Sequence, residues 1–274
     1  MEKVTKTLLG NYKNIYTLNG YTLPSDKQNF FKYMPYDRLM TSIENKDFVF
    51  VSPRTWRDPF ERIYFNTDCS KHGYTTENIY CLCVTEKSTT NEEAAWNTYT
   101  GQTKGVKISI DYKVLFQLLD NYAQEKDCNI YIGRVIYDFE KRLIETIYKN
   151  QYYKEIFCPS QMSTEHYLSL LLLKRKSFSY ENEIRIFIVQ NKKPCTSIDE
   201  NLLHIPCDYA NLRIISQVML SPYEPINKND ANAQMIQDTN VTDSNNYIYK
   251  IKQKLSCRIV QCRLYEGIKN IKSV

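Results

Sequence analysis

Short alternating runs of apolar and polar residues predict a chain built from many strands with several helices between them. In the run 106–111, apolar side chains occupy every second position, which is typical of a strand with one buried face. We expect strands at residues 30–34, 48–51, 79–85, 106–111, 131–137, 181–189, 213–220 and 255–265. Apolar residues at helical spacing predict helices at 35–45, 91–99, 112–126, 138–156, 162–175 and 227–238.

These elements follow one another without an internal repeat or a linker of low complexity. The sequence therefore predicts the α+β class and a single domain over 29–274, with a mixed or antiparallel sheet. The helices at 138–156 and 162–175 form an inserted helical pair within residues 138–176. Residues 1–28 are polar with scattered Tyr and Leu, which indicates an N-terminal arm or cap.

The run 177–188 is the most informative part of the chain. Glu181, Glu183 and Arg185 occupy alternate positions, and strand-forming residues follow at once. Residues two apart in a strand point the same way, so we expect these three charges on one face. An unpaired buried charge is costly, and three charges therefore favour a cleft over a core. The alternative is an edge strand with a solvated face and a local Glu–Arg pair.

Composition excludes some classes of protein. The 274 residues are 42% hydrophobic and include 23 Tyr and 11 Phe, enough for a folded core. The net charge is +5, which permits contact with nucleic acid without arguing for it. No apolar run is long enough to span a membrane, and the first ten residues lack the apolar stretch of a signal peptide. We therefore expect a cytoplasmic protein without membrane contact.

Nine cysteines in a reducing compartment are expected to be free thiols. One group has zinc-ligand spacing, since Cys69, His72, Cys81 and Cys83 lie within 15 residues of one another. The alternative is that Cys81 and Cys83 lie in a strand and share one face. The sequence leaves the zinc site open.

Several motifs together resemble a widespread bacterial family known as domain of unknown function 2971. In order along the chain they are Lys32-Tyr33, Asn45-Lys-Asp-Phe-Val-Phe, Asp58-Pro-Phe-Glu61, Cys81-Leu-Cys, Trp96-Asn-Thr-Tyr99, Gly105-Val-Lys-Ile and Tyr180-Glu-Asn-Glu-Ile-Arg185. The resemblance covers about residues 30 to 265. Arg57 departs from it, because the family typically has Asn there, and Asn is better suited to a tight turn.

The order of elements also looks like the ADP-ribosyltransferase fold of the DNA-modifying toxins. Such proteins have an aromatic strand, then a Pro-Arg segment, and a late strand with one essential glutamate. The resemblance implies that Glu183 is the catalytic residue and that Glu181 completes a Glu-x-Glu pair. It implies that Arg54 contacts NAD.

The same resemblance implies NAD as substrate, with Lys32 at a polar position of the first strand. Tyr33, Trp56 or Tyr99 would stack on nicotinamide or adenine. A carboxylate beside the ribose stabilises an oxocarbenium-like centre, and an arginine fork suits a pyrophosphate. Such activities serve as bacterial toxins or phage-defence effectors. The acceptor would then be nucleic acid or protein, and a regulatory or antitoxin partner would be expected.

Two other functions stay open on the sequence. One is a nucleic-acid-binding module without chemistry, using the basic run Lys174-Arg-Lys176 and the many tyrosines. The other is a metal-dependent nuclease. Its magnesium ligands would be Asp58, Glu61, Glu181 and Glu183.

Overall fold

A computed structural model of the chain describes residues 6–23, 29–62, 78–86, 92–101, 104–139, 163–191, 200–222, 247–262 and 264. The chain divides into two compact units that interleave along the sequence. Unit 1 is drawn from residues 1–27, 49–84 and 116–205, and unit 2 from 28–48, 85–115 and 206–274.

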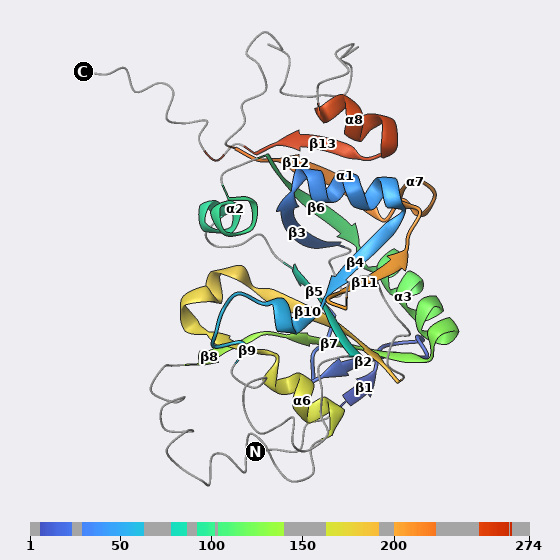
Figure 1. The fold of residues 1–274 in the computed structure, drawn as a ribbon, viewed down its shortest axis with the longest axis vertical. Coiled ribbons are helices and arrows are strands. Elements are labelled where there is room, and N and C mark those ends of the chain that lie inside the picture. The colour runs from blue at the N-terminus through green and yellow to red at the C-terminus, as the bar shows by residue number, and fades with distance from the viewer. Residues whose placement is uncertain are drawn as a thin grey trace, which may run out of the picture. The chain divides into compact units, whose positions relative to one another are not determined.

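Unit 1 is organised around strand β10, Glu183–Gln190 (Figure 1). The strands in hydrogen-bonded order are β1 (Lys6–Leu8), β2 (Ile15–Leu18), β7 (Cys128–Arg134), β10 and β5 (Ile79–Thr85). The strand β4 (Asp47–Val51) pairs with β5, and β11 (Leu202–Pro206) pairs with β4. The pair β2–β7 is parallel and the pair β7–β10 antiparallel, so the sheet is mixed.

The remaining elements of unit 1 lie around this sheet. They are the short 3-10 helix η1 (Pro53–Thr55), the helix α6 (Thr164–Leu170), the 3-10 helix η5 (Lys176–Glu181) and the parallel pair of β8 (Ile136–Phe139) with β9 (Leu173–Arg175). The helix α3, Tyr112–Lys126, starts in unit 2 and continues into unit 1. A buried apolar cluster joins the sheet to α6 and includes Leu18, Tyr131, Leu168, Leu172 and Phe187.

Unit 2 contains the strand order β3 (Asn29–Pro35), β6 (Gly105–Asp111), β12 (Ile215–Leu220) and β13 (Arg258–Gln261). The first two pairs are antiparallel and the last is parallel. Its helices are α1 (Tyr36–Asn45), α2 (Glu92–Thr100), α7 (Tyr209–Leu212) and α8 (Tyr247–Lys254). Helix α1 begins after Pro35 and ends at a left-handed Lys46, so the predicted boundaries 35–45 are confirmed.

The α+β class and the mixed sheet are confirmed, and most expected strands and helices are present. Residues within the expected N-terminal arm form β1 and β2, and β2 pairs with β7. The helix expected at 162–175 is wrong at its end: it stops at Leu170, and Leu173–Arg175 pairs with β8. Pairing with a strand distant in sequence overrides the local helical spacing there. The helix expected at 227–238 and residues 140–156 of the helix expected at 138–156 lie outside the described residues.

Candidate active site

The Glu-x-Glu motif does not form a continuous strand. Glu181 is the last residue of η5, Asn182 has a left-handed backbone with φ 47°, and β10 begins at Glu183. Asn tolerates this conformation better than most residues, which explains the break between the two glutamates. The prediction that Glu181 projects from the same strand face as Glu183 is therefore wrong.

Arg185 is the centre of the site and is fully buried. Its Nε donates to Glu183 Oε1 over 2.9 Å, and its Nη2 donates to Glu61 Oε1 over 2.9 Å and to Glu183 Oε2 over 3.2 Å. The remaining nitrogen, Nη1, donates to the carbonyl oxygen of Leu171. The ring of Trp56 lies 4.0 Å from the guanidinium carbon, within cation–π range. The alternative of an edge strand with a solvated face is thus wrong, because the arginine faces carboxylates in the interior.

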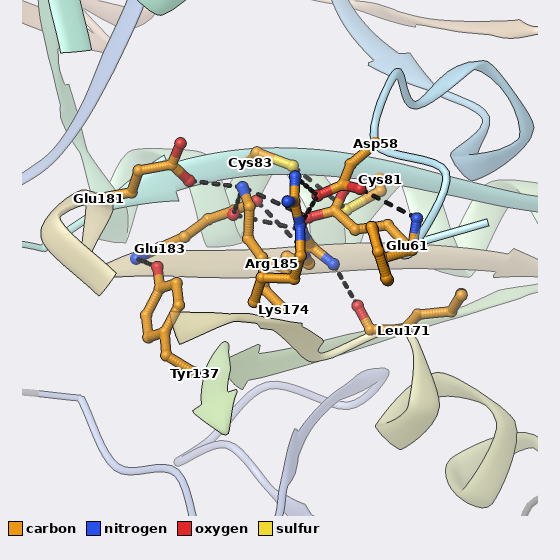
Figure 2. Close-up of polar contacts among 12 residues, drawn as sticks. Asp58, Glu61, Cys81, Cys83, Tyr137, Leu171, Lys174, Glu181, Glu183 and Arg185 are labelled. Atoms are coloured by element: carbon orange, nitrogen blue, oxygen red, sulfur yellow. Dashed lines mark hydrogen bonds and ion pairs between the residues drawn. The ribbon is translucent and has the colours of Figure 1, made fainter. Parts of the chain in front are cut away.

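Lys174 of β9 completes the charged group. Its ammonium lies 2.5 Å from Glu181 Oε2, 2.8 Å from Glu183 Oε2 and 3.4 Å from Glu61 Oε1. Figure 2 shows Glu181 and Glu183 on one side of the two basic side chains and Glu61 on the other. Lys174 therefore joins the two glutamates of the motif, which the backbone itself separates.

We call Glu61, Lys174, Glu181, Glu183 and Arg185 the ion cluster. All five residues are at most 8% exposed. Three carboxylates against two cations leave the five side chains with a formal charge of −1, and burial makes each pairing matter more than it would at the surface.

The ion cluster shifts the pKa of Glu183 and the pKa of Lys174 in opposite directions. Burial alone would raise the pKa of Glu183, but Arg185 and Lys174 outweigh it and hold that pKa well below its usual range. Burial would likewise lower the pKa of Lys174, yet Glu183, Glu61 and Glu181 raise it. Glu183 is therefore ionised and Lys174 protonated at neutral pH.

A second layer of residues fixes the ion cluster in place. The Tyr137 hydroxyl accepts a hydrogen bond from the backbone N–H of Glu183 over 2.7 Å, and the Cys83 thiol hydrogen-bonds to the Glu183 carboxylate. Gly133 pairs with Arg185 across the sheet. A Cβ at Gly133 would lie 2.5 Å from Leu172 Cδ1, so glycine leaves room for the turn that carries the Leu171 carbonyl.

The Asp58-Pro-Phe-Glu61 turn reaches the same region from the other side. Asp58 Oδ1 accepts from the N–H of Phe60, and its Oδ2 accepts from Arg175 Nε over 3.0 Å. The Arg175 guanidinium lies 4.7 Å from the ring centre of Phe60 and 4.9 Å from that of Phe178. This turn is thus held by two arginines, Arg175 at Asp58 and Arg185 at Glu61.

The sequence-predicted site residues fall into separate groups. Glu181 and Glu183 come together through Lys174. Arg54 is exposed in η1, where its backbone N–H donates to Ser52 Oγ. It lies close enough to Tyr167 to lower that residue's pKa, although burial raises it overall.

Lys32, Tyr33 and Tyr99 belong to unit 2. The rings of Tyr33 and Tyr99 are stacked with centres 6.4 Å apart, and the Trp96 ring meets Tyr33 edge-on at 4.9 Å. The ammonium of Lys107 lies 5.2 Å from the Tyr33 ring and 2.9 Å from Glu92 Oε1. We call Tyr33, Glu92, Trp96, Tyr99 and Lys107 the aromatic–lysine cluster. Lys32 precedes Tyr33 on β3, so the two side chains project from opposite faces of that strand.

Metal binding was the alternative use of these side chains. Asp58 is bound by Arg175 and Glu61 by Arg185, while Lys174 binds Glu181 and Glu183. Within the described part of the chain, no three His, Cys, Asp and Glu side chains are placed to hold a metal ion. Cys81 and Cys83 share one face of β5, with their sulfurs 3.9 Å apart. Cys69 and His72 lie outside the described residues, so the question of a zinc site stays open.

Sequence reasoning missed the central role of Lys174. The run Lys174-Arg-Lys176 ends an expected helix and was a candidate for nucleic-acid binding, yet Lys174 is buried in β9. The signal was the alternation Leu173-Lys174-Arg175, which is too short to distinguish a strand from a helix end. The contact of Trp56 with Arg185 had no sequence signal, because the two residues are far apart along the chain.

Residues 95–186 match the family model described as Protein of unknown function (DUF2971), which confirms the resemblance to that family over this range. The matched range contains β6, α3, β7 and the Glu-x-Glu-x-Arg motif, while Trp56, Asp58 and Glu61 precede it. No curated protein and no solved structure matches the chain. Among the described residues, no helix is both long and apolar enough to cross a membrane.

Proposed function

We propose that the chain cleaves the bond between nicotinamide and ribose in NAD, and transfers ADP-ribose to an acceptor or to water. The observation that carries this proposal is the state of Glu183. Its carboxylate is ionised, and three hydrogen bonds from Arg185 and Lys174 fix both oxygens. A fixed negative charge stabilises a developing oxocarbenium centre without having to reorganise during the reaction.

The two glutamates divide the chemistry. When the N-glycosidic bond breaks, nicotinamide leaves with the electron pair and the ribose carbon becomes cationic beside Glu183. The acceptor oxygen or nitrogen then forms its bond to that carbon, and its proton passes to Glu181. The ion cluster carries a formal charge of −1, so it favours a positively charged centre over a neutral one.

Burial sets a condition for this chemistry. Glu183 is 3% exposed, and η5 holds Glu181 against Lys174. NAD can reach the carboxylate only when η5 moves away from β9. Exchange of the Lys174–Glu181 contact for contacts with the substrate would offset the cost of that movement. Of the residues predicted to contact NAD, Arg54 belongs to unit 1 together with Glu183, and the proposal relies on Arg54 alone among them.

In a bacterial cell, this activity would act as a toxin or as a phage-defence effector. Consumption of NAD or modification of an essential acceptor arrests growth, so a regulatory or antitoxin partner would be needed until an infection occurs. The resemblance in element order to ADP-ribosyltransferases supports this role, and expression of the chain without such a partner should slow growth.

The direct test is release of nicotinamide by the purified protein, with and without DNA, RNA and cell lysate. We expect Glu183→Gln to lower the rate about 10²–10³-fold, the size of effect seen when one preorganised electrostatic group is removed. Glu181→Gln is the matched control: it neutralises the neighbouring carboxylate of the same ion cluster. It should reduce transfer to an acceptor more than hydrolysis.

Thermal unfolding of the same variants separates chemistry from stability. Glu183→Gln and Glu181→Gln both bring the formal charge of the ion cluster from −1 to zero. A loss of rate in Glu183→Gln while the variant is still folded at the assay temperature is therefore a loss of chemistry. Absence of nicotinamide release by the wild type under every condition would refute the proposed function. Equal activity of wild type and Glu183→Gln would refute the role of Glu183.

A further inference from the structure

In two segments of unit 1, the acidic side chains are bound to basic partners while most of the basic side chains are exposed to solvent. In residues 54–62 and 173–181, the acidic side chains Asp58, Glu61 and Glu181 each bind a basic side chain of unit 1. The basic side chains of the same segments, apart from Lys174, are exposed or partly exposed. They are Arg54, Arg57, Arg62, Arg175 and Lys176.

The two segments lie side by side. Arg175 bonds to Asp58 across 3.0 Å, and its guanidinium lies between the rings of Phe60 and Phe178. The ring of Tyr180 follows at 6.4 Å from Phe178. These three rings are each only partly buried. These two segments therefore bring exposed or partly exposed basic side chains and partly buried rings into one region of unit 1, which we call the basic face.

We propose that the basic face binds single-stranded nucleic acid and that this strand is the acceptor for the transfer described above. Exposed arginines and a lysine provide contacts for phosphates, and partly exposed rings provide surfaces on which unpaired bases stack. A duplex keeps its bases stacked on one another, so the rings favour a single strand.

The place of the basic face explains why a bound strand would be an acceptor. Arg175 follows Lys174, whose ammonium is 2.8 Å from Glu183. Lys176 begins η5, the element that ends at Glu181. A strand bound across Arg175 and Lys176 therefore lies beside the element whose movement uncovers the two glutamates. The acceptor role rests on the proposed function, whereas binding of the strand does not.

The test is fluorescence anisotropy with a labelled oligonucleotide of about 12 nucleotides, within the range one such surface covers, in the absence of NAD. The variant Arg57→Glu/Lys176→Glu is compared with Lys13→Glu/Lys126→Glu. The control changes two exposed lysines of unit 1 that lie away from the basic face, near Asp120 and at the end of α3. Both double variants lower the net charge by the same amount.

We expect the basic-face variant to bind the oligonucleotide at least about tenfold more weakly. The slope of the logarithm of the binding constant against the logarithm of the salt concentration should become smaller in magnitude by about 1.4, which is about 0.7 for each lost phosphate contact. The control should keep the affinity and salt dependence of the wild type within about twofold. Tyr180→Ala should weaken binding of the single strand and leave its salt dependence unchanged, because stacking releases no counterions.

Three results would overturn the proposal: no binding by the wild type, equal losses in both double variants, or equal affinity for a duplex of the same length. Nicotinamide release measured in parallel keeps the two proposals apart. Binding without turnover supports the basic face and refutes the proposed chemistry. Turnover without binding refutes the basic face alone.

Discussion

Among the residues that the structure describes, each unit buries one lysine, and the two lysines are kept charged in different ways. Lys174 of the ion cluster has three carboxylates within 3.4 Å. Lys107 of the aromatic–lysine cluster has Glu92 at 2.9 Å, with the rings of Phe31 and Tyr33 each 5.2 Å away. Glu92 keeps 27% of its side chain exposed, whereas Glu181 and Glu183 are almost completely buried.

The difference shows how the cost of a buried charge depends on its partners. Burial would lower the pKa of both lysines, and in both the surroundings raise it instead. If Lys107 is removed, its one carboxylate can turn to solvent. If Lys174 is removed, three carboxylates remain beside one arginine in the interior, and a buried unpaired charge is costly. Loss of either basic residue of the ion cluster should therefore be the more damaging change.

The two tryptophans of the chain allow this comparison to be measured in each unit separately. Trp56 contacts Arg185 in unit 1, and Trp96 contacts Tyr33 in unit 2. In a Trp96→Phe background, fluorescence during urea unfolding reports on unit 1. In a Trp56→Phe background it reports on unit 2.

The largest expected effect is that of Arg185→Met. It leaves Glu61 and Glu183 without their shared guanidinium and the Leu171 carbonyl without its donor. We expect the free energy of unfolding, followed by Trp56, to fall by about 3–5 kcal/mol. Arg57→Met is the matched control on an exposed arginine and should change it by less than about 0.5 kcal/mol. Equal effects of the two would show that the ion cluster is not a unit of stability.

Lys174→Met should lower the free energy of unfolding by about 3 kcal/mol at pH 7, since one partner of a buried charge network is lost. Its effect should also depend on pH. In the wild type the folded-state pKa of Glu183 is depressed, so its stabilising contribution is present above the ordinary value of 4.5 and is lost as pH falls.

Without Lys174, the pKa of Glu183 moves back toward that ordinary value, and acid removes less stability. The gap between wild type and Lys174→Met should therefore narrow between about pH 7 and pH 3.5. Unfolding curves at both pH values measure it. A constant gap would mean that Lys174 contributes through packing alone.

Trp56→Leu should lower the free energy of unfolding by an intermediate amount, about 2 kcal/mol. This loss combines a desolvated cation–π contact with lost apolar area. Circular dichroism is the measurement here, since the substitution removes the fluorescent reporter of unit 1. Trp56→Phe keeps an aromatic ring over the guanidinium and should recover at least half of the loss. If Phe and Leu behave alike, the contact is apolar packing and not cation–π attraction.

The smallest expected effect is that of Lys107→Met, which should lower the free energy of unfolding by about 1 kcal/mol or less. Glu92 is partly exposed, and an apolar side chain can pack against the rings. Trp96 fluorescence follows it in the Trp56→Phe background. A loss as large as that of Lys174→Met would contradict the distinction drawn between the two clusters.

Local patterns determined much of the fold. Pro35 before an apolar helical repeat located α1, and strict alternation located β5 and β6, because these signals depend only on neighbours along the chain. The alternation Glu183-Ile-Arg185 correctly placed these two charges on one face of a strand. The sequence could not show that Asn182 breaks the motif, since a left-handed residue is one of several conformations that Asn permits.

The tertiary structure alone decided what the charges contact. Arg185 and Glu61 are 124 residues apart in sequence and 2.9 Å apart in space, and no local period relates them. Whether a carboxylate is solvated or buried depends on which strands flank it, and β10 lies between β7 and β5. Burial and long-range ion pairing arise only when distant segments meet. The sequence therefore named the glutamates, but only the fold showed that Lys174 binds them and that Glu61 and Trp56 contact Arg185.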